Sequence, residues 1–284
     1  MSKLRIVVTG ASGFIGRHVV RQLMANNQIE LIQVSRRVLP NFQTVSNYSE
    51  TPCGDILIHL AEDNNVERVA NRNIQDINSA IETTNALTKK KYGRIIYASS
   101  ALVYGDKSIS PHSINDALNV ESIYARMKKD SEKIILTNPN GIVLRLANVY
   151  GLGMSKENVI SEVIKKIRNT ADIEIRDSSP IRDFIWVNDV AEGITSIALS
   201  KYGNNEKSNI YNLSTGIGTS IGELTRIALE IYGQSGRRIM SNNSNNSNSC
   251  IVLDPSHTKD IFGWKYRTTL RLGLSELILN GSEN

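Results

Sequence analysis

Short apolar runs alternate with amphipathic stretches through the first half of the chain. The runs are rich in β-branched residues, and the stretches between them repeat apolar positions every three or four residues. These are the patterns of buried strands and of helices. We predict strands at Leu4–Thr9, Leu31–Val34, Ile56–Ala61, Arg94–Ser99 and Ile142–Leu146, and helices at Phe14–Ala25, Val66–Lys90 and Ser122–Thr137. Such alternation predicts an α/β doubly wound parallel sheet, covered on both faces.

The alternation weakens after Gly151. Helical patterns at 157–168, 189–199 and 220–232 are separated by short strands and loops. We therefore predict one domain at 1–150 and a second, smaller α/β lobe at 151–284, with 184–213 returning to the first domain. The Asn/Ser-rich run at 242–249 predicts a mobile surface loop.

Composition narrows the class of protein. The 284 residues are 40% hydrophobic and 21% charged, and no apolar stretch is long enough to span a bilayer. The N-terminus enters a strand without an apolar export signal, and two cysteines, Cys53 and Cys250, suit a reducing compartment. We expect a cytoplasmic protein without a metal site. The net charge of +5 is spread along the chain, so neither nucleic acid nor a membrane is an expected partner.

A glycine-rich turn follows the first predicted strand and opens the first predicted helix. Its spacing is G-x-x-G-x-x-G, from Gly10 to Gly16. Glycines let the backbone approach a pyrophosphate, and the helix N-terminus offers free N–H groups to it. We therefore predict a Rossmann-type dinucleotide-binding domain. The expected cofactor contacts in this turn are Gly10, Ser12, Gly13, Phe14, Ile15 and Gly16.

The end of the second strand bears on the choice of cofactor. An acidic residue there would hold the ribose 2′-OH of NAD, whereas arginine favours the 2′-phosphate of NADP. This chain has Ser35, Arg36 and Arg37 at that place, with no acid. The residues favour NADP(H), with NAD(H) as the alternative.

A tyrosine and a lysine lie four residues apart in the predicted helix at Ser122–Thr137. This spacing puts Tyr124 and Lys128 on one helix face, where an ammonium stabilises a phenolate for proton transfer. Upstream, Ala98-Ser99-Ser100 brings hydroxyls to the end of a predicted strand, at the sheet edge where parallel sheets bind ligands. A hydroxyl there would hydrogen-bond a reacting oxygen.

The order of the glycine turn, the serine and the Y-x-x-x-K motif resembles the NAD-dependent epimerase/dehydratase family, the extended short-chain dehydrogenases. Four later segments extend the resemblance over nearly the whole chain: Leu146–Gly151, Arg182–Val187, Tyr211–Leu213 and Asp254–Trp264. The resemblance implies a nucleotide-sugar substrate, bound by the smaller lobe, and a homodimer.

The resemblance also implies roles for single residues. Ser100 would be the catalytic hydroxyl, Tyr124 the general acid/base, and Lys128 the group that stabilises the phenolate and holds the nicotinamide ribose. The substrate diphosphate would contact Asn148 and Arg182. Further cofactor contacts would be Leu60, Ala61 and Asn73. The family's R-P-G-D segment, which helps to bind the nucleotide, falls in the Asn/Ser-rich run and is missing.

The resemblance leaves more than one activity open. Ala101-Leu102 replaces the Asp-Glu pair of the 4,6-dehydratases, and no cysteine stands near the strand-end hydroxyl as in GDP-fucose synthases. Two enzymatic readings remain. The favoured one is NADPH-dependent reduction of a 4-keto-6-deoxy nucleotide sugar, for surface polysaccharide synthesis, and the other is a 4-epimerase that retains NAD. A third reading, a non-catalytic NADP-sensing regulator, conflicts with the presence of Ser100, Tyr124 and Lys128.

Overall fold

A seven-stranded sheet forms the centre of the larger lobe, in the order β10-β6-β5-β4-β1-β2-β3. Every neighbouring pair in it is parallel. Its strands are β1 (Leu4–Thr9), β2 (Ile29–Ser35), β3 (Gln43–Thr44), β4 (Ile56–His59), β5 (Arg94–Ser100), β6 (Gly141–Leu146) and β10 (Ile210–Leu213). The computed structural model describes residues 2–62, 69–71, 74–107, 110–169, 171–201, 209–242 and 249–281.

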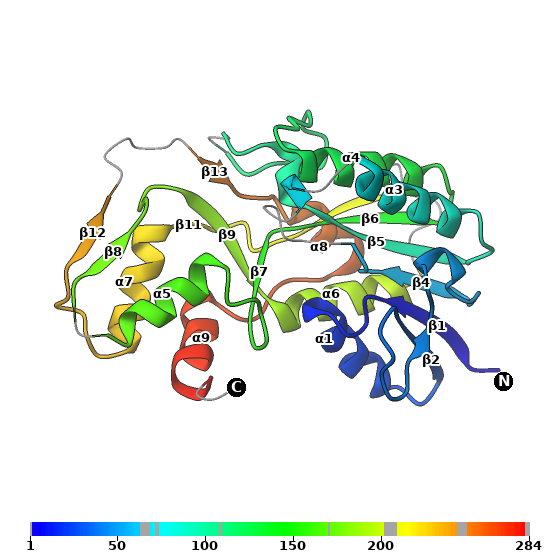
Figure 1. The fold of residues 1–284 in the computed structure, drawn as a ribbon, viewed down its shortest axis with the longest axis horizontal. Helices are drawn as coiled ribbons and strands as arrows, with labels where there is room; N and C mark the ends of the chain where they lie inside the picture. Colours follow the sequence, from blue (N-terminus) through cyan, green and yellow to red (C-terminus); the bar gives the residue numbers. More distant parts are fainter. Residues whose placement is uncertain are drawn as a thin grey trace.

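Helices cover both faces of this sheet, as its apolar strands require. All residues of β4 and β6 are buried. Helices α1 (Phe14–Met24) and α6 (Val187–Leu199) pack together on one face, and α3 (Ile74–Thr88) and α4 (Ile123–Leu136) on the other (Figure 1). The predicted doubly wound α/β class is confirmed.

The smaller lobe has its own sheets and its own core. Strand β9 (Ile181–Trp186) lies between β11 (Gly218–Ser220) and β13 (Cys250–Ile251) and also pairs with β7 (Asn148–Tyr150), while β8 (Ile173–Ile175) pairs with β12 (Ile239–Ser241). Helices α5 (Val159–Ile167), α7 (Ile221–Ile231) and α9 (Leu270–Ser275) enclose a separate apolar cluster there, to the left in Figure 1. Helix α8 (Ser256–Phe262) lies against β10.

The chain crosses between the lobes more than once. In the segment 184–213, the first three residues end strand β9 of the smaller lobe, whereas α6 and β10 belong to the larger lobe. The domain limits of 1–150 and 151–284 stay a prediction. Residues 243–248 of the predicted surface loop lie outside the described residues. No helix within the described ranges combines the length and the apolar character that a membrane span requires.

Candidate active site

Two glycines bring backbone close to backbone at the end of β1. Gly10 has a φ of 70°, and a Cβ there would lie 2.6 Å from the carbonyl oxygen of Leu60, which follows β4. A Cβ at Gly16 would overlap the carbonyl oxygen of Gly10. Because any side chain would collide at either position, the tight turn needs glycine at both.

The first turn of α1 suits an anion. Its N-cap, Gly13, supplies no side-chain cap, and the first turn has no acidic residue. Uncapped N–H groups and the positive end of the helix dipole favour a phosphate at this place. The predicted contacts Gly10, Ser12, Gly13, Phe14, Ile15 and Gly16 therefore lie in one turn whose shape and charge fit a dinucleotide.

The end of β2 carries cations and no carboxylate. Ser35 is buried, and its Oγ accepts a hydrogen bond from the Arg37 backbone N–H at 2.9 Å, which fixes the turn. Arg36 is exposed, and its guanidinium lies 5.3 Å from the ring centroid of Tyr48. The Tyr48 ring thus holds a cation beside the strand end.

Leu60 and Ala61 lie beside the glycine turn. The Leu60 N–H donates to the Thr9 carbonyl at 3.2 Å, and the Ala61 backbone nitrogen is among the atoms nearest to Gly10. Asn73 lies outside the described residues.

Ser100, Tyr124 and Lys128 lie on two elements that pack together, β5 and α4. Ser100 is the last residue of β5, one beyond the predicted end, and its Oγ accepts from the Leu102 N–H at 3.2 Å. Tyr124 and Lys128 are both buried. The Lys128 Nζ donates to the Ala98 carbonyl at 2.9 Å and lies 5.9 Å from the Tyr124 ring centroid. The lysine thus joins the tyrosine helix to the strand that ends at the serine.

This cluster also contains a buried carboxylate, Glu62, that was not predicted from the sequence. Glu62 Oε2 lies 2.9 Å from Lys128 Nζ, and both side chains are about 5% exposed. Burial favours the neutral form of both groups, but their attraction outweighs it: the pKa of Glu62 is lowered and that of Lys128 is raised. The pair is therefore ionised. A signal existed, because Glu62 directly follows the strand-end segment His59-Leu60-Ala61.

His59, at the end of β4, is kept neutral beside this pair. Burial lowers its pKa to about 4, despite the attraction of the Glu62 carboxylate. Its Nδ1 lies 2.6 Å from the Thr9 hydroxyl. At neutral pH it adds no charge to the site.

A second buried ion pair lies one turn further along α4. The Arg145 guanidinium donates to both carboxylate oxygens of Glu132, at 3.1 and 2.8 Å. The same carboxylate accepts from the Ser99 hydroxyl, next to Ser100. This pair attaches α4 to β5 and β6 and was also not predicted.

Strand pairing brings the two predicted substrate residues near each other. Asn148 opens β7 and lies opposite Phe184 of β9, two residues along from Arg182. The Arg182 guanidinium donates to the Ser249 Oγ at 2.7 Å, and that hydroxyl donates to Asp106 at 2.9 Å. Arg182 thus already has polar partners, which a substrate diphosphate would have to displace or share.

The neighbouring residue, Asp183, faces the opposite way, into the protein. Its carboxylate accepts from the backbone N–H groups of Thr215 and Gly216, both at 3.0 Å. These bonds oppose the rise in the pKa of Asp183 that burial causes, although the pKa stays raised. Asp183 thereby fixes the register of β9 and the direction of Arg182.

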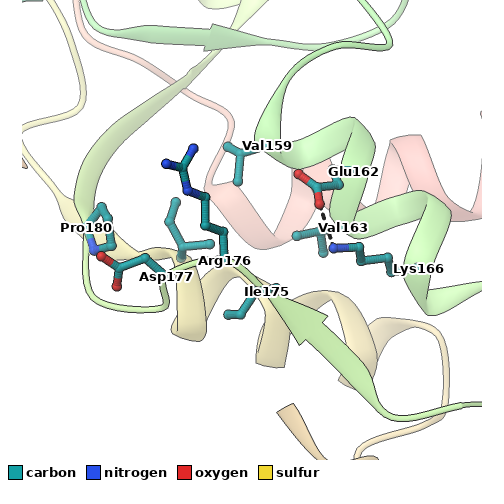
Figure 2. Close-up of a pocket in the computed structure, with 9 residues that line it drawn as sticks. Val159, Glu162, Val163, Lys166, Ile175, Arg176, Asp177 and Pro180 are labelled. Carbon is teal, nitrogen blue, oxygen red and sulfur yellow. Dashed lines mark hydrogen bonds and ion pairs between the residues drawn. The ribbon is translucent and has the colours of Figure 1, made fainter. Parts of the chain in front are cut away.

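The smaller lobe also contains a cavity of about 200 Å³. Figure 2 shows it between helix α5, which contributes Val159, Glu162 and Lys166, and the segment after β8, with Arg176 extending between them. Its lining combines an apolar wall with charges of both signs.

Known proteins are similar to this chain over most of its length. A family model described as the NAD dependent epimerase/dehydratase family matches residues 6–214. A provisionally named UDP-glucose 4-epimerase from Methanocaldococcus jannaschii is 29% identical, over 96% of this chain and 97% of the relative. A GDP-6-deoxy-D-talose 4-dehydrogenase from Aggregatibacter actinomycetemcomitans is 27% identical, over 98% of both chains.

Solved structures match the fold over almost the whole chain. A UDP-glucose 4-epimerase from Thermotoga maritima, with UDP-glucose, has a TM-score of 0.83 at 23% identity and covers 97% of this chain and 98% of its own. The RMD protein from Pseudomonas aeruginosa, complexed with NADPH, has a TM-score of 0.82 at 23% identity and covers 98% of both chains. At this identity the matches establish the fold.

Proposed function

The chain belongs to the NAD dependent epimerase/dehydratase family, and from this membership we propose that it reduces the 4-keto group of a nucleotide-linked 4-keto-6-deoxy sugar with NADPH. The observation that carries the proposal is the end of β2. A carboxylate there would repel a 2′-phosphate, whereas this chain has Ser35 followed by Arg36, whose guanidinium is held beside the strand by Tyr48.

The larger lobe fits the cofactor that this activity needs. The turn at Gly10–Gly16 would hold the pyrophosphate, Arg36 the 2′-phosphate and Lys128 the nicotinamide ribose. When bound, the cofactor supplies the hydride. The remaining chemistry, proton delivery to the new alcohol oxygen, is left to side chains of this chain.

Tyr124 is the proposed proton donor. It lies on the same helix face as Lys128, whose ammonium stabilises the phenolate left after proton transfer. The Ser100 hydroxyl, at the end of β5, would hydrogen-bond the carbonyl oxygen and hold it for the proton. Neither step needs a carboxylic acid after Ser100, and Ala101 and Leu102 supply none.

The smaller lobe would hold the nucleotide sugar. Asn148 and Arg182 lie close to each other on paired strands, and the guanidinium suits a diphosphate. The cavity between α5 and Arg176 is the place that we expect for the nucleoside end (Figure 2).

Similarity to two relatives supports reduction. The A. actinomycetemcomitans protein is named as a 4-dehydrogenase of a GDP-6-deoxy sugar, which is the same kind of reaction in the opposite direction. The P. aeruginosa structure contains NADPH.

A nucleotide-sugar 4-epimerase is the second candidate. It is favoured by the 29% identity to the M. jannaschii protein and by similarity to the UDP-glucose 4-epimerase of Bacillus subtilis. Such an enzyme oxidises and then reduces the same sugar carbon and consumes no reductant.

One assay separates the two. We expect 4-keto-6-deoxy nucleotide sugars, offered as both UDP and GDP forms, to cause loss of NADPH absorbance at 340 nm, with slower loss of NADH. Interconversion of UDP-glucose and UDP-galactose without cofactor consumption, together with no oxidation of NADPH on any keto sugar, would replace the reductase by the epimerase.

A further inference from the structure

The Glu62 carboxylate is fixed from three sides. Besides the ion pair with Lys128, its Oε2 accepts from the Tyr97 hydroxyl at 2.6 Å, and its Oε1 accepts from the hydroxyls of Ser131 at 2.9 Å and Thr84 at 3.2 Å. These donors come from β5, α4 and α3. A buried carboxylate with this set of donors is ionised and has little freedom to move.

We propose that Glu62 is a positioning residue for the reaction centre: it fixes the Lys128 ammonium against the Ala98 carbonyl and balances its charge beside Tyr124. The inference rests on the proposed function, since it assigns the proton transfer to Tyr124 and Lys128.

The orientation of the Lys128 ammonium follows from the number of its N–H bonds that already have acceptors. An ammonium has three N–H bonds, and two point at fixed acceptors, Glu62 Oε2 and the Ala98 carbonyl, each 2.9 Å away. The direction of the third is then determined. A lysine on a flexible stem would otherwise sample several directions, so Glu62 removes freedom that a ligand would have to remove on binding.

The net charge that Tyr124 faces follows from the ionisable groups around the Glu62–Lys128 pair. Within the part of the chain that the structure describes, the ionisable groups that face the pair are His59 from β4, Tyr97 from β5, and Tyr124 and Glu132 from α4. His59 is neutral at physiological pH, and Glu132 has its own partner in Arg145. Glu62 is therefore the counter-ion that decides whether Tyr124 faces a net positive charge or a neutral pair.

The test is the ionisation of Tyr124 in the folded protein, read from phenolate absorbance at 295 nm without cofactor or substrate. Subtracting the same spectrum of the matching Tyr124→Phe variant isolates this one phenol. Since Lys128 Nζ lies 5.9 Å from the Tyr124 ring centroid and 2.9 Å from Glu62 Oε2, the carboxylate oxygen is no further from that centroid than these two distances together. At an effective dielectric constant of about 20, a unit charge on the order of 10 Å from a phenol moves its midpoint by about one pH unit. We therefore expect Glu62→Gln to lower the midpoint by about one pH unit.

Removing each charge of the pair alone and both together tests the charge of Glu62 without relying on a single variant. Lys128→Met leaves the carboxylate unbalanced and should raise the midpoint, and adding Glu62→Gln to Lys128→Met should lower it again relative to Lys128→Met alone. If Glu62→Gln alone does not fold, the comparison of the double variant with Lys128→Met still isolates the carboxylate. Ser131→Ala is the matched control, because it removes a neutral hydrogen bond to Glu62 and keeps both charges, so its midpoint should stay at the wild-type value.

The proposal is overturned if removing Glu62 leaves the midpoint unchanged or raises it in both lysine backgrounds, or if Ser131→Ala shifts it as much as Glu62→Gln does. The outcome is separable from the proposed function because the titration needs no substrate. Lack of turnover on every nucleotide sugar would refute the function and leave the titration result in force. Normal turnover with an unshifted titration would refute only the role of Glu62.

Discussion

Replacing Arg36 with alanine tests the feature that carries the proposed preference for NADPH. The side chain is exposed and its guanidinium lies 5.3 Å from the Tyr48 ring centroid, so the substitution opens no cavity in the core. Its loss removes a cation–π contact of about 0.5–1 kcal/mol at an exposed site, which is small beside the stability of a domain. The fold should therefore survive, and the effect should fall on the ligand.

The size of that effect follows from the bond that is lost. A charge-assisted hydrogen bond to a phosphate contributes about 1.5–3 kcal/mol, which corresponds to about 10- to 150-fold in affinity. We expect the dissociation constant of NADPH to rise by at least about tenfold in Arg36→Ala and that of NADH to change less than about twofold. Adding Ser35→Asp should lower NADPH affinity further, because a carboxylate would then face the phosphate.

Titration of both cofactors by quenching of protein fluorescence, at one fixed salt concentration, measures this directly. Arg21→Ala is the matched control, because Arg21 is an exposed arginine in the last turn of α1, far along the helix from the glycine turn. The Arg21→Ala variant shows how much cofactor affinity changes when a positive charge is lost away from the end of β2. Equal losses for NADPH and NADH, or a wild-type preference for NAD, would refute the reasoning and move the leading function to the 4-epimerase.

Three further outcomes are expected. Tyr124→Phe should keep the fold and cofactor affinity and lose about 10²–10⁴-fold in turnover, measured by the rate of NADPH oxidation; wild-type turnover would remove Tyr124 from the mechanism. By resemblance to the family we expect a homodimer that packs helices such as α4 between subunits, and light scattering that gives a monomer mass at micromolar concentration would contradict it. Stability should fall as pH drops from about 6.5 to about 4, because the unfolded chain protonates His59 while the folded chain does not. The loss is on the order of 3 kcal/mol, and denaturant melts of His59→Asn should show a weaker pH dependence over that window.

The fold was predictable because its signals are local. The strands β1, β4, β5 and β6 are mostly apolar runs bounded by polar or glycine residues, and the glycine turn at Gly10–Gly16 fixes the order of the first strand and helix. Helix α4 begins one residue after the predicted Ser122, whose hydroxyl caps it by accepting from the Ala125 N–H at 3.1 Å. The predicted helix at Val66–Lys90 is shorter in the structure, where α3 spans Ile74–Thr88 and Asn71 before it lies in a turn. Most other boundaries differ by one or two residues, because helix ends depend on such caps.

The charges beneath the site were not predictable in the same way. Glu62 follows a strand-end segment, but it is 66 residues from Lys128 in the chain, and nothing in either local pattern indicates that the segment after β4 meets α4. Glu132 looks like an ordinary polar position on an amphipathic helix until β6 places Arg145 opposite it. Pairings of this kind depend on three-dimensional packing, which periodicity does not encode.

The two buried pairs are better explained by geometry than by stability. Moving two charges out of water costs nearly as much as their attraction returns, so such pairs seldom add much to the free energy of unfolding. Lys128 and Glu132 are, however, successive positions on the face of α4 that also carries Tyr124, each four residues from the next. Lys128 bonds to β5 and to Glu62, and Glu132 bonds to β5 and β6. The helix is therefore attached to the sheet at two consecutive turns. That attachment leaves α4 little freedom to rotate or slide, and it fixes the position of the Tyr124 phenol relative to Ser100 before any ligand arrives.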